Sequence, residues 1–376
     1  MFEDQIKMVS QVRETYADKF MHQQPTTPIE LIKDITDQIP FDGNASVLVM
    51  FTIEWALYLK HVGYKDVTVA AQGTDAIAKF CQYFGFKYIN LDEKNNKMKF
   101  DVIVGNPPFQ MKKGNAKIAI GTTIIKKAYT EMLADRGILA MVSASSFLGG
   151  GQKGLGYLFT ENQTDRVWLR LNQYFPKIGI DIGGFVIRKI QSTSPIVRVV
   201  TIDGDVDITA SDFVYNKTRP YIPRSITPAT LPILRKIISY NTEVFDFRAS
   251  DSKGAHHKIG FWAGANTGIH PQYLKITHTG EFDSKWINHP CKLDAEYPDE
   301  NIRAVFAGKW FHFVITAISG SQASSRPANL SFFPKIDLSK KWSFDELGDL
   351  FNMTAEEKNV VLNWASTRPA KHWADN

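Results

Sequence analysis

The run SVLVMF at residues 46–51 decides the fold class, because it is short and apolar on both faces. A run of this kind is typical of a strand buried inside a parallel sheet. The segment EWALYLKHVG at 54–63 follows with helical spacing and ends in glycine, which favours a helix that stops there. The two segments together predict the first half of a βαβ unit.

The same alternation continues on both sides of this unit. At the N-terminal side, Thr27 is the expected N-cap of a helix whose first turn holds Pro28. Further along the chain, apolar runs alternate with helical patterns, which indicates a doubly wound, mostly parallel α/β sheet closed by a two-strand hairpin antiparallel to it. The remaining expected helices are 5–20, 28–39, 74–85 and 122–137, and the remaining expected strands are 67–71, 87–91, 99–105, 138–145, 167–175 and 182–189.

The composition changes after Gln191, which places a domain boundary near 190–205. The sequence therefore predicts one domain over 1–200 and another over 201–376. The second domain is expected to be strand-rich and α+β as far as about residue 335, and to end in two short helices. Thr354 stands three residues before Glu357, the spacing of a capping box at the start of the last helix.

Composition and charge exclude several classes of protein. The chain has 376 residues, a net charge of +5 and 44% hydrophobic residues, which suits a folded protein with a sizeable core. Its two cysteines are too few for a disulfide scaffold or a zinc-ribbon site, so no metal is expected. The N-terminal segment is charged, and no apolar run reaches membrane-spanning length. These features predict a cytoplasmic protein that does not enter a membrane.

The expected strand at 99–105 runs into Asn106-Pro107-Pro108-Phe109, a turn of unusual chemistry. Two prolines remove two N–H donors and keep their carbonyl acceptors. Gly105, just before them, allows a close backbone approach. The segment therefore offers acceptors, an amide and an aromatic face, which suit a planar ligand bearing an amino group. The alternative is a proline-rich turn that ends the strand with Phe109 in the core.

This tetrapeptide resembles motif IV of the amino-methyltransferases, and its Asn form followed by Phe is similar to the N6-adenine DNA methyltransferases. In architecture the resemblance covers residues 20–200. Thr26-Thr27-Pro28 looks like the cofactor-proximal segment of that family, and Phe51-Thr52-Ile53-Glu54-Trp55 stands at motif I. A weaker resemblance covers the C-terminal tail. The resemblance implies S-adenosyl-methionine as cofactor, with contacts at Thr27, Phe51, Glu54, Gln72, Asp92 and Asn106.

Two positions depart from the family pattern. Motif I normally holds a glycine-rich turn where the backbone meets the cofactor, and Phe51–Trp55 contains no glycine. Motif II normally ends in an acidic residue for the ribose hydroxyls, whereas Gln72 stands there and Asp75 follows three residues later. The catalytic half of the resemblance is thus intact and the cofactor half is atypical.

The resemblance also implies the chemistry of the target. The Asn106 side-chain oxygen and the Pro107 carbonyl would accept the two N–H bonds of the adenine amino group, and Phe109 would stack on a flipped base. Lys112, Lys113, Lys117 and Arg326 are the expected DNA contacts, although a solvated helix face and a plain surface loop are alternatives for them. The G-x-G-x-x-G match at 149–154 follows the fifth strand and predicts a loop, and His256-His257 lacks a third metal ligand.

The resemblance therefore implies an adenine-specific DNA methyltransferase with catalytic residues Asn106, Pro107 and Phe109. The first domain would bind cofactor and base, and the second would recognise a specific sequence of double-stranded DNA. A separate restriction endonuclease is a possible partner. The alternatives are an inactive DNA-binding paralogue, motivated by the glycine-less motif I, and an amino-methyltransferase acting on RNA or protein glutamine.

Overall fold

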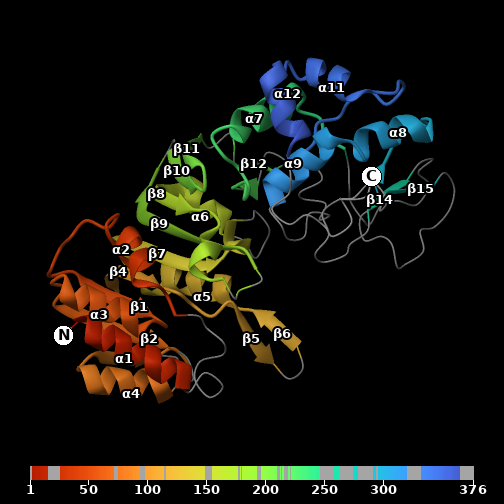
Figure 1. The fold of residues 1–376 in the computed structure, drawn as a ribbon. Helices are drawn as coiled ribbons and strands as arrows, with labels where there is room; N and C mark the ends of the chain where they lie inside the picture. The colour runs from red at the N-terminus through yellow and green to blue at the C-terminus, as the bar shows by residue number, and fades with distance from the viewer. Residues whose placement is uncertain are drawn as a thin grey trace. The chain divides into compact units, whose positions relative to one another are not determined.

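A computed structural model places the chain in two compact units (Figure 1). One consists of residues 1–200 and 207–211, and the other of 201–206 and 212–376. The structure describes residues 2–15, 26–71, 75–93, 98–113, 116–148, 155–176, 178, 180–192, 196–209, 212, 214–215, 219–220, 222–245, 258–261, 274–277, 291–293, 295–319 and 332–364.

The main sheet follows the strand order β11-β10-β8-β9-β7-β4-β1-β2-β3. Strands β3, β2, β1, β4 and β7 are parallel to their neighbours within this group. The strand β9 is antiparallel to both β7 and β8, and β10 is parallel to β8. The mostly parallel α/β sheet predicted from the sequence is thereby confirmed. The bounds are β1 Ser46–Met50, β2 Asp66–Ala71, β3 Lys87–Asn90, β4 Phe100–Gly105, β7 Leu133–Ala144, β8 Asn162–Trp168, β9 Ile182–Gln191, β10 Ile196–Thr201 and β11 Gly204–Thr209.

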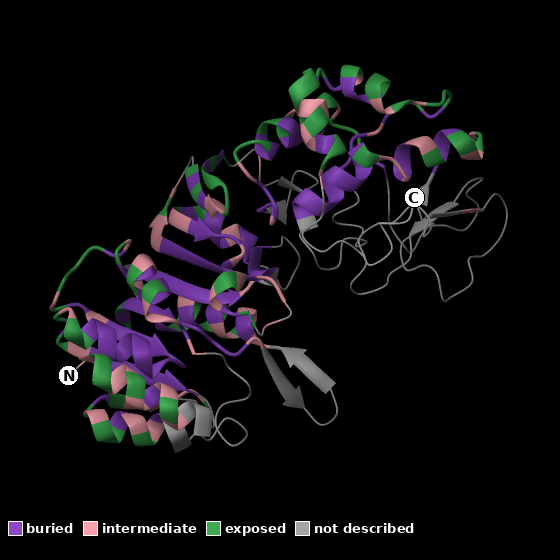
Figure 2. Cartoon of the chain, viewed as in Figure 1, coloured by how far each residue is buried: buried purple, intermediate pink, exposed green. Residues whose placement is uncertain are grey.

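The strand β1 lies between β4 and β2, which explains its apolar character on both faces. Val47, Leu48 and Val49 are fully buried, and Figure 2 shows the central strands as continuously buried ribbon. Full burial of such a side chain stabilises the fold by about 1.5–3 kcal/mol. The stretch that decides the fold class therefore also forms the middle of the core.

The helices of the first unit pack along the sheet and on one another (Figure 1). The ring of Phe2 stacks on His61 at 4.6 Å between centroids, which joins α1 to α3. The indole of the buried Trp55 donates to Thr36 Oγ1 at 3.0 Å, which joins α3 to α2. The bounds are α1 Phe2–Thr15, α2 Ile29–Thr36, α3 Ile53–His61, α4 Asp75–Phe84, α5 Gly121–Lys127 and α6 Gly156–Glu161.

The helix predicted over 122–137 is wrong at its C-terminal end. The helix α5 continues into a π-helical turn at Ala128–Met132, and β7 begins at Leu133. The strand turns through Arg136, which has a φ of +63°. A Cβ at Gly137 would lie 2.9 Å from Ala134 O and 3.0 Å from Asp101 O. Residues 133–137 have a composition that favours a helix, but they belong to the sheet because they pair with β4.

The closing hairpin also differs from the prediction. The strand β8 covers Asn162–Trp168 and is followed by a short 3-10 helix at Leu171–Tyr174, whereas a strand over 167–175 was expected. The strand β9 inserts between β7 and β8 and runs antiparallel to both. An aromatic cluster of Phe147, Phe159 and Phe185, with centroids 5.0–6.0 Å apart, covers this insertion.

Helices form the core of the described part of the second unit, where a strand-rich segment was predicted. The central helix α9 buries Trp310, Phe311 and Phe313. Phe311 meets Phe306 and Phe333 edge to face, at 5.0 and 5.1 Å between centroids. The helices are α7 Thr230–Tyr240, α8 Asp299–Phe306, α9 Lys309–Ser319, α11 Phe344–Leu350 and α12 Ala355–Leu362, and the strands are β12 Val214–Tyr215, β13 Arg219–Pro220, β14 Lys258–Phe261, β15 Leu274–Thr277 and β16 Cys291–Lys292.

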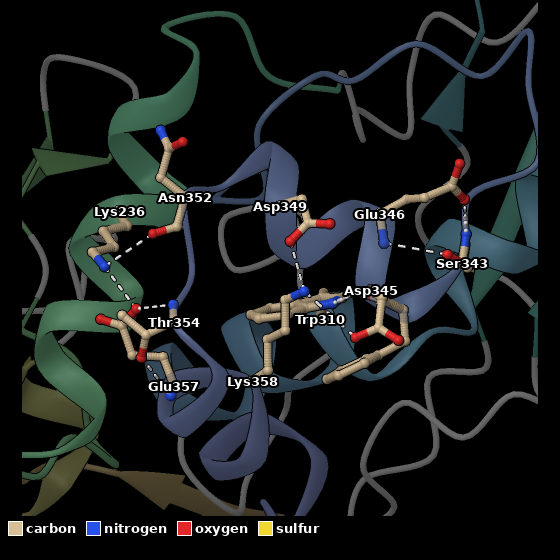
Figure 3. A network of polar contacts seen from close by, with 11 residues as sticks. Lys236, Trp310, Ser343, Asp345, Glu346, Asp349, Asn352, Thr354, Glu357 and Lys358 are labelled. Atoms are coloured by element: carbon tan, nitrogen blue, oxygen red, sulfur yellow. Dashed lines mark hydrogen bonds and ion pairs between the residues drawn. The ribbon is translucent and has the colours of Figure 1, made fainter.

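Two capping boxes begin the predicted C-terminal helices. Glu357 N donates to Thr354 Oγ1 at 3.2 Å and Thr354 N donates to Glu357 Oε2 at 2.8 Å, so the predicted box is confirmed. Ser343 and Glu346 form the same arrangement at α11. Figure 3 shows the ion pairs around them, in which Lys236 contacts Glu357 at 2.6 Å.

No helix within the described ranges combines the length and the apolar character needed to cross a bilayer. Among the same residues, no group of three His, Cys, Asp or Glu side chains is placed to hold a metal ion.

The β1–β4 contact predicts a stability effect at Gly105. A Cβ there would lie 2.4 Å from Met50 O. Overpacking typically costs roughly 1–3 kcal/mol of stability, and Gly105→Ala should cost at least the upper value of that range. Gly85→Ala is the control, because Gly85 has a φ of +72° with nothing within 4 Å. Gly85→Ala should lower the stability by roughly 1–2 kcal/mol, the cost of the left-handed backbone alone. Urea unfolding measures both variants, and a larger loss for Gly85→Ala would contradict the prediction.

The capping box of α11 predicts an acid-dependent stability. Hydrogen bonds from the Ser343 backbone and hydroxyl, with Lys340 nearby, lower the pKa of Glu346 from 4.5 to about 2. Because the folded pKa is depressed, the stabilisation is complete above pH 4.5 and is lost as pH falls toward 2. Calorimetry should therefore find that Glu346→Gln lowers the melting temperature at pH 7, and that its gap to the wild type narrows below pH 4. A gap independent of pH would contradict this assignment.

Candidate active site

The sheet order reverses direction between β1 and β4, and ligands of doubly wound sheets bind beyond the carboxyl ends of the strands at such a point. The carboxyl end of β1 is Met50 and that of β4 is Gly105, and the two residues pair in register. Asn106 N donates to Met50 O at 3.2 Å. The sequence-predicted motif therefore begins at the edge where this fold places a ligand.

The side chain of Asn106 is completely buried and is held at one end. Its Nδ2 donates to Thr27 Oγ1 at 3.1 Å, and Thr27 is 1% exposed. Its Oδ1 is buried and has no hydrogen-bond partner among the described residues. A buried acceptor left open is costly in a folded protein unless a ligand or water fills it. The amide therefore presents an acceptor to a ligand that carries an N–H group.

The role predicted for Thr27 as a helix cap is wrong. The N-cap of α2 is Pro28, and no side chain caps this helix. Pro28 can hold this position because it already has the extended backbone that a cap requires, with φ −60° and ψ 145°. The hydroxyl of Thr27 is thereby left to accept from Asn106, which lies 79 residues further along the chain.

The turn from β1 to α3 consists of Phe51 and Thr52 alone. Phe51 has a φ of +65°, a conformation that favours glycine, and is buried to 3% exposure. Left-handed backbone costs roughly 1–2 kcal/mol, whereas burying a Phe stabilises by about 1.5–3 kcal/mol. Ring burial thus offsets the strain, and this accounts for a left-handed turn without the glycine of the family pattern.

The first turn of α3 brings polar groups to the same edge of the sheet. Thr52 is the N-cap residue but its side chain makes no cap hydrogen bond, and its buried Oγ1 has no partner among the described residues. Glu54 follows in the first turn and is 1% exposed. A carboxylate is favoured near a helix N-terminus by the helix dipole. The cofactor-binding predictions at Phe51 and Glu54 thus fall beside the Asn106 edge, and Thr52 joins them.

The two prolines are buried, and Phe109 is half-buried, so part of its ring is accessible. Gly121, at the start of α5, lies against this segment. A Cβ there would be 3.0 Å from the buried Ser143 Oγ and 3.5 Å from Pro108 O. The start of α5 therefore packs against both the proline turn and the C-terminal end of β7.

The other predicted site residues are placed less closely. Asp92 is exposed after β3, and its N–H donates to Asn90 Oδ1 at 3.1 Å. The alternative of a solvated helix face for Lys112, Lys113 and Lys117 is wrong, because all three lie on strands. They lie on the antiparallel ribbon of β5 Gln110–Lys113 and β6 Ala116–Ala119, where Lys112 pairs with Lys117. The remaining predicted positions, Gln72, Arg326, His256-His257 and 149–154, lie outside the described residues.

Sequence reasoning missed Thr52, Gly121 and Ser143 as parts of this edge. Thr52 carried a signal, since it precedes a helix directly after the central strand. Gly121 and Ser143 carried none, because their importance comes from the packing of β7 and α5 against the proline turn.

Comparison with known proteins gives a family match for the first unit. Residues 15–174, somewhat less than half of the chain, match the family described as Eco57I restriction-modification methylase. No curated protein matches the chain. Over these residues the first unit is therefore similar to restriction-modification methylases.

Three of the solved structures that the chain matches come from bacteria. The methyltransferase subunit of a type I restriction-modification system from Streptococcus thermophilus is 18% identical, with a TM-score of 0.37 and coverage of 48% of this chain and 47% of that one. A protein from Vibrio vulnificus YJ016, described as the modification subunit of a type I restriction enzyme, is 13% identical, with a TM-score of 0.45 and coverage of 61% and 64%. A protein from Listeria monocytogenes, described as a class I S-adenosylmethionine-dependent methyltransferase, is 10% identical, with a TM-score of 0.42 and coverage of 53% and 73%. The chain thus spans less than two thirds of the length of the first two proteins.

The polar groups at this edge fit a cofactor such as S-adenosyl-methionine. Thr52 Oγ1 is buried and has no hydrogen-bond partner among the described residues, and α3 begins directly after it with the buried Glu54 in its first turn. An amino acid carboxylate and ammonium, together with ribose hydroxyls, need donors and acceptors of these kinds.

Proposed function

We propose that this chain transfers a methyl group from S-adenosyl-methionine to the N6 amino group of adenine in DNA. The observation that carries the proposal is the buried Asn106 amide at the switch point of the sheet, whose nitrogen donates to Thr27 and whose buried oxygen has no partner among the described residues. The family match over 15–174 supports methyl transfer. The Asn-Pro-Pro-Phe sequence favours an amino group as the acceptor.

Asn106 and Pro107 would activate the amino group. The N6 lone pair is delocalised into the adenine ring, so N6 is a weak nucleophile. An acceptor on each N–H bond draws electron density onto nitrogen and stabilises the positive charge that develops there. Asn106 Oδ1 supplies one acceptor. The carbonyl of Pro107, the next residue in the chain, would supply the other.

The cofactor when bound supplies a methyl group already activated as a sulfonium. The residues of the chain then have mainly to orient the reactants and exclude water. Thr52, Glu54 and Phe51 would hold the cofactor beside β1, and Asp92 would do so after β3. Gln72, which lies outside the described residues, would supply a further contact. Neither a metal nor a nucleophilic triad is required of these residues.

Phe109 and the β5–β6 ribbon would handle the DNA. A base inside a duplex is out of reach, so the adenine must be flipped out. Half-buried Phe109 directly follows the two prolines and offers a surface for stacking. A two-stranded ribbon is of a size that the major groove admits, and the register of this one pairs Lys112 with Lys117. The second unit would then recognise a specific sequence, and a separate restriction endonuclease would be the functional partner in the cytoplasm.

A second candidate function is DNA binding without methylation. The observation that favours it is the two-residue turn in which buried Phe51 occupies a position suited to glycine. Calorimetry with S-adenosyl-methionine separates the two functions. Micromolar affinity supports the enzyme, and no binding up to millimolar concentration by a folded protein that binds DNA supports the binding protein.

Replacing Asn106 tests the proposal. Asn106→Ala should lower methyl transfer to duplex DNA by about 10²–10³-fold, because it removes a preorganised acceptor, while cofactor affinity stays within about threefold. Asn162→Ala is the matched control, since it removes another buried amide of the same unit that bonds Leu158 O and Tyr129. The assay measures labelled methyl transfer, with RNA and protein acceptors in parallel. Full activity of Asn106→Ala, or transfer to RNA or protein in preference to DNA, would refute the proposal.

Replacing Phe109 tests base stacking. Phe109→Trp should retain activity, because an aromatic face remains. Phe109→Ala should lose roughly 1–3 kcal/mol of stacking, which is about one to two decades in rate or affinity. For comparison, Phe147→Ala, in the fully buried aromatic cluster, should lose roughly 3–5 kcal/mol of fold stability. A large fall in melting temperature for Phe109→Ala with normal activity per folded molecule would remove the stacking role.

A further inference from the structure

Thr27 makes a contact that its place in the sequence does not explain. It precedes α2 without capping it, and it is buried beside Asn106. The hydrogen bond from Asn106 Nδ2 to Thr27 Oγ1, at 3.1 Å, joins the segment before α2 to the end of β4. Because both side chains are buried away from bulk water, water does not compete for this hydrogen bond.

The two ends of the Asn106 amide have opposite chemistry. The oxygen accepts hydrogen bonds and the NH₂ group donates them. An amino substrate also donates, so only the oxygen can serve it productively. Rotation of the amide by half a turn would place a donor against a donor, and Asn106 would then hinder binding. The reaction therefore depends on which end faces the substrate.

The hydroxyl of Thr27 can itself accept or donate, so it could hold either end of the amide. The two arrangements differ in the group that is left open at the sheet edge. When Asn106 Nδ2 bonds to Thr27, the Asn106 oxygen is the group without a partner. If Asn106 Oδ1 bonded to Thr27 instead, the NH₂ group would be the one without a partner. Buried N–H groups without partners are rarer in proteins than under-satisfied carbonyl oxygens. The observed arrangement, with Asn106 Oδ1 open among the described residues, is thus the favoured one.

We propose that Thr27 is a positioning residue that fixes the orientation of the Asn106 amide, so that Oδ1 and not Nδ2 faces the amino group of the substrate. Thr27 acts through Asn106 and need not touch the substrate. This inference rests on the proposed methyl transfer to an amino group, and it assigns to Thr27 a role different from the cofactor contact implied by the family resemblance.

The test compares Thr27→Val, which keeps the shape and removes the hydroxyl, with Thr27→Ser, which keeps the hydroxyl. Thr36→Val is the matched control, because Thr36 Oγ1 also accepts a buried N–H bond, from Trp55 Nε1 at 3.0 Å, away from the site. Thr27→Val should lower single-turnover methyl transfer by about 10²-fold. Thr27→Ser should stay within about threefold of the wild type, and Thr36→Val should retain its rate per folded molecule. Cofactor affinity measured by calorimetry should change less than about threefold in all three variants.

A second readout does not depend on turnover. The side-chain NH₂ signals of Asn106, assigned by NMR from the Asn106→Ala spectrum, should be protected from hydrogen exchange in the wild type and in Thr27→Ser. They should exchange at least tenfold faster in Thr27→Val. Equal rates of methyl transfer in the wild type and Thr27→Val, loss of transfer in Thr27→Ser, or loss of cofactor binding in Thr27→Val would each overturn the positioning role. Absence of transfer by the wild type to any amino acceptor would overturn the proposed function itself, and the exchange experiment would show whether the bond exists without it.

Discussion

The contact between the carboxyl ends of β1 and β4 is the constraint on which the candidate site depends. Gly105 lies so close to Met50 that a Cβ would meet the Met50 carbonyl oxygen at 2.4 Å. The backbone of Asn106 then bonds to that same oxygen. Since β1 and β4 flank the point where the strand order reverses, this close approach sets the amide of Asn106 at the edge where doubly wound sheets bind ligands.

Residues around this contact adopt locally unfavourable arrangements that place polar groups at the sheet edge. Phe51 adopts left-handed backbone, and two buried oxygens, on Thr52 and Asn106, have no partner among the described residues. Each feature is unfavourable for an isolated fold. Their coincidence at one sheet edge, within a mostly well-paired core, is typical of a site that a ligand completes. The glycine-less turn is thus an alternative construction of the edge, in which a buried ring offsets backbone strain.

The second unit is stabilised by different means. Its core is aromatic, with α9 contributing Trp310 and Phe311. Its last two helices begin with capping boxes, and the Lys236–Glu357 ion pair ties the box of α12 to α7 (Figure 3). The sequence KWFHFVITAIS of α9 is rich in β-branched and aromatic residues, which favour strands when read locally. Burial of nearly all its side chains outweighs that propensity, because helical stability in proteins comes mainly from tertiary packing.

The sequence by itself determined the elements whose signals are local. The apolar run at 46–51, the βα alternation and the Thr354–Glu357 box depend on neighbouring residues, and the Asn-Pro-Pro-Phe turn carries its chemistry in four consecutive positions. Tertiary structure alone decided what depends on distant parts of the chain. The insertion of β9 between β7 and β8 is a choice among strand pairings that have similar local patterns. The bond between Thr27 and Asn106 spans 79 residues, and it forms because Pro28 already begins α2 and leaves the threonine hydroxyl to the end of β4.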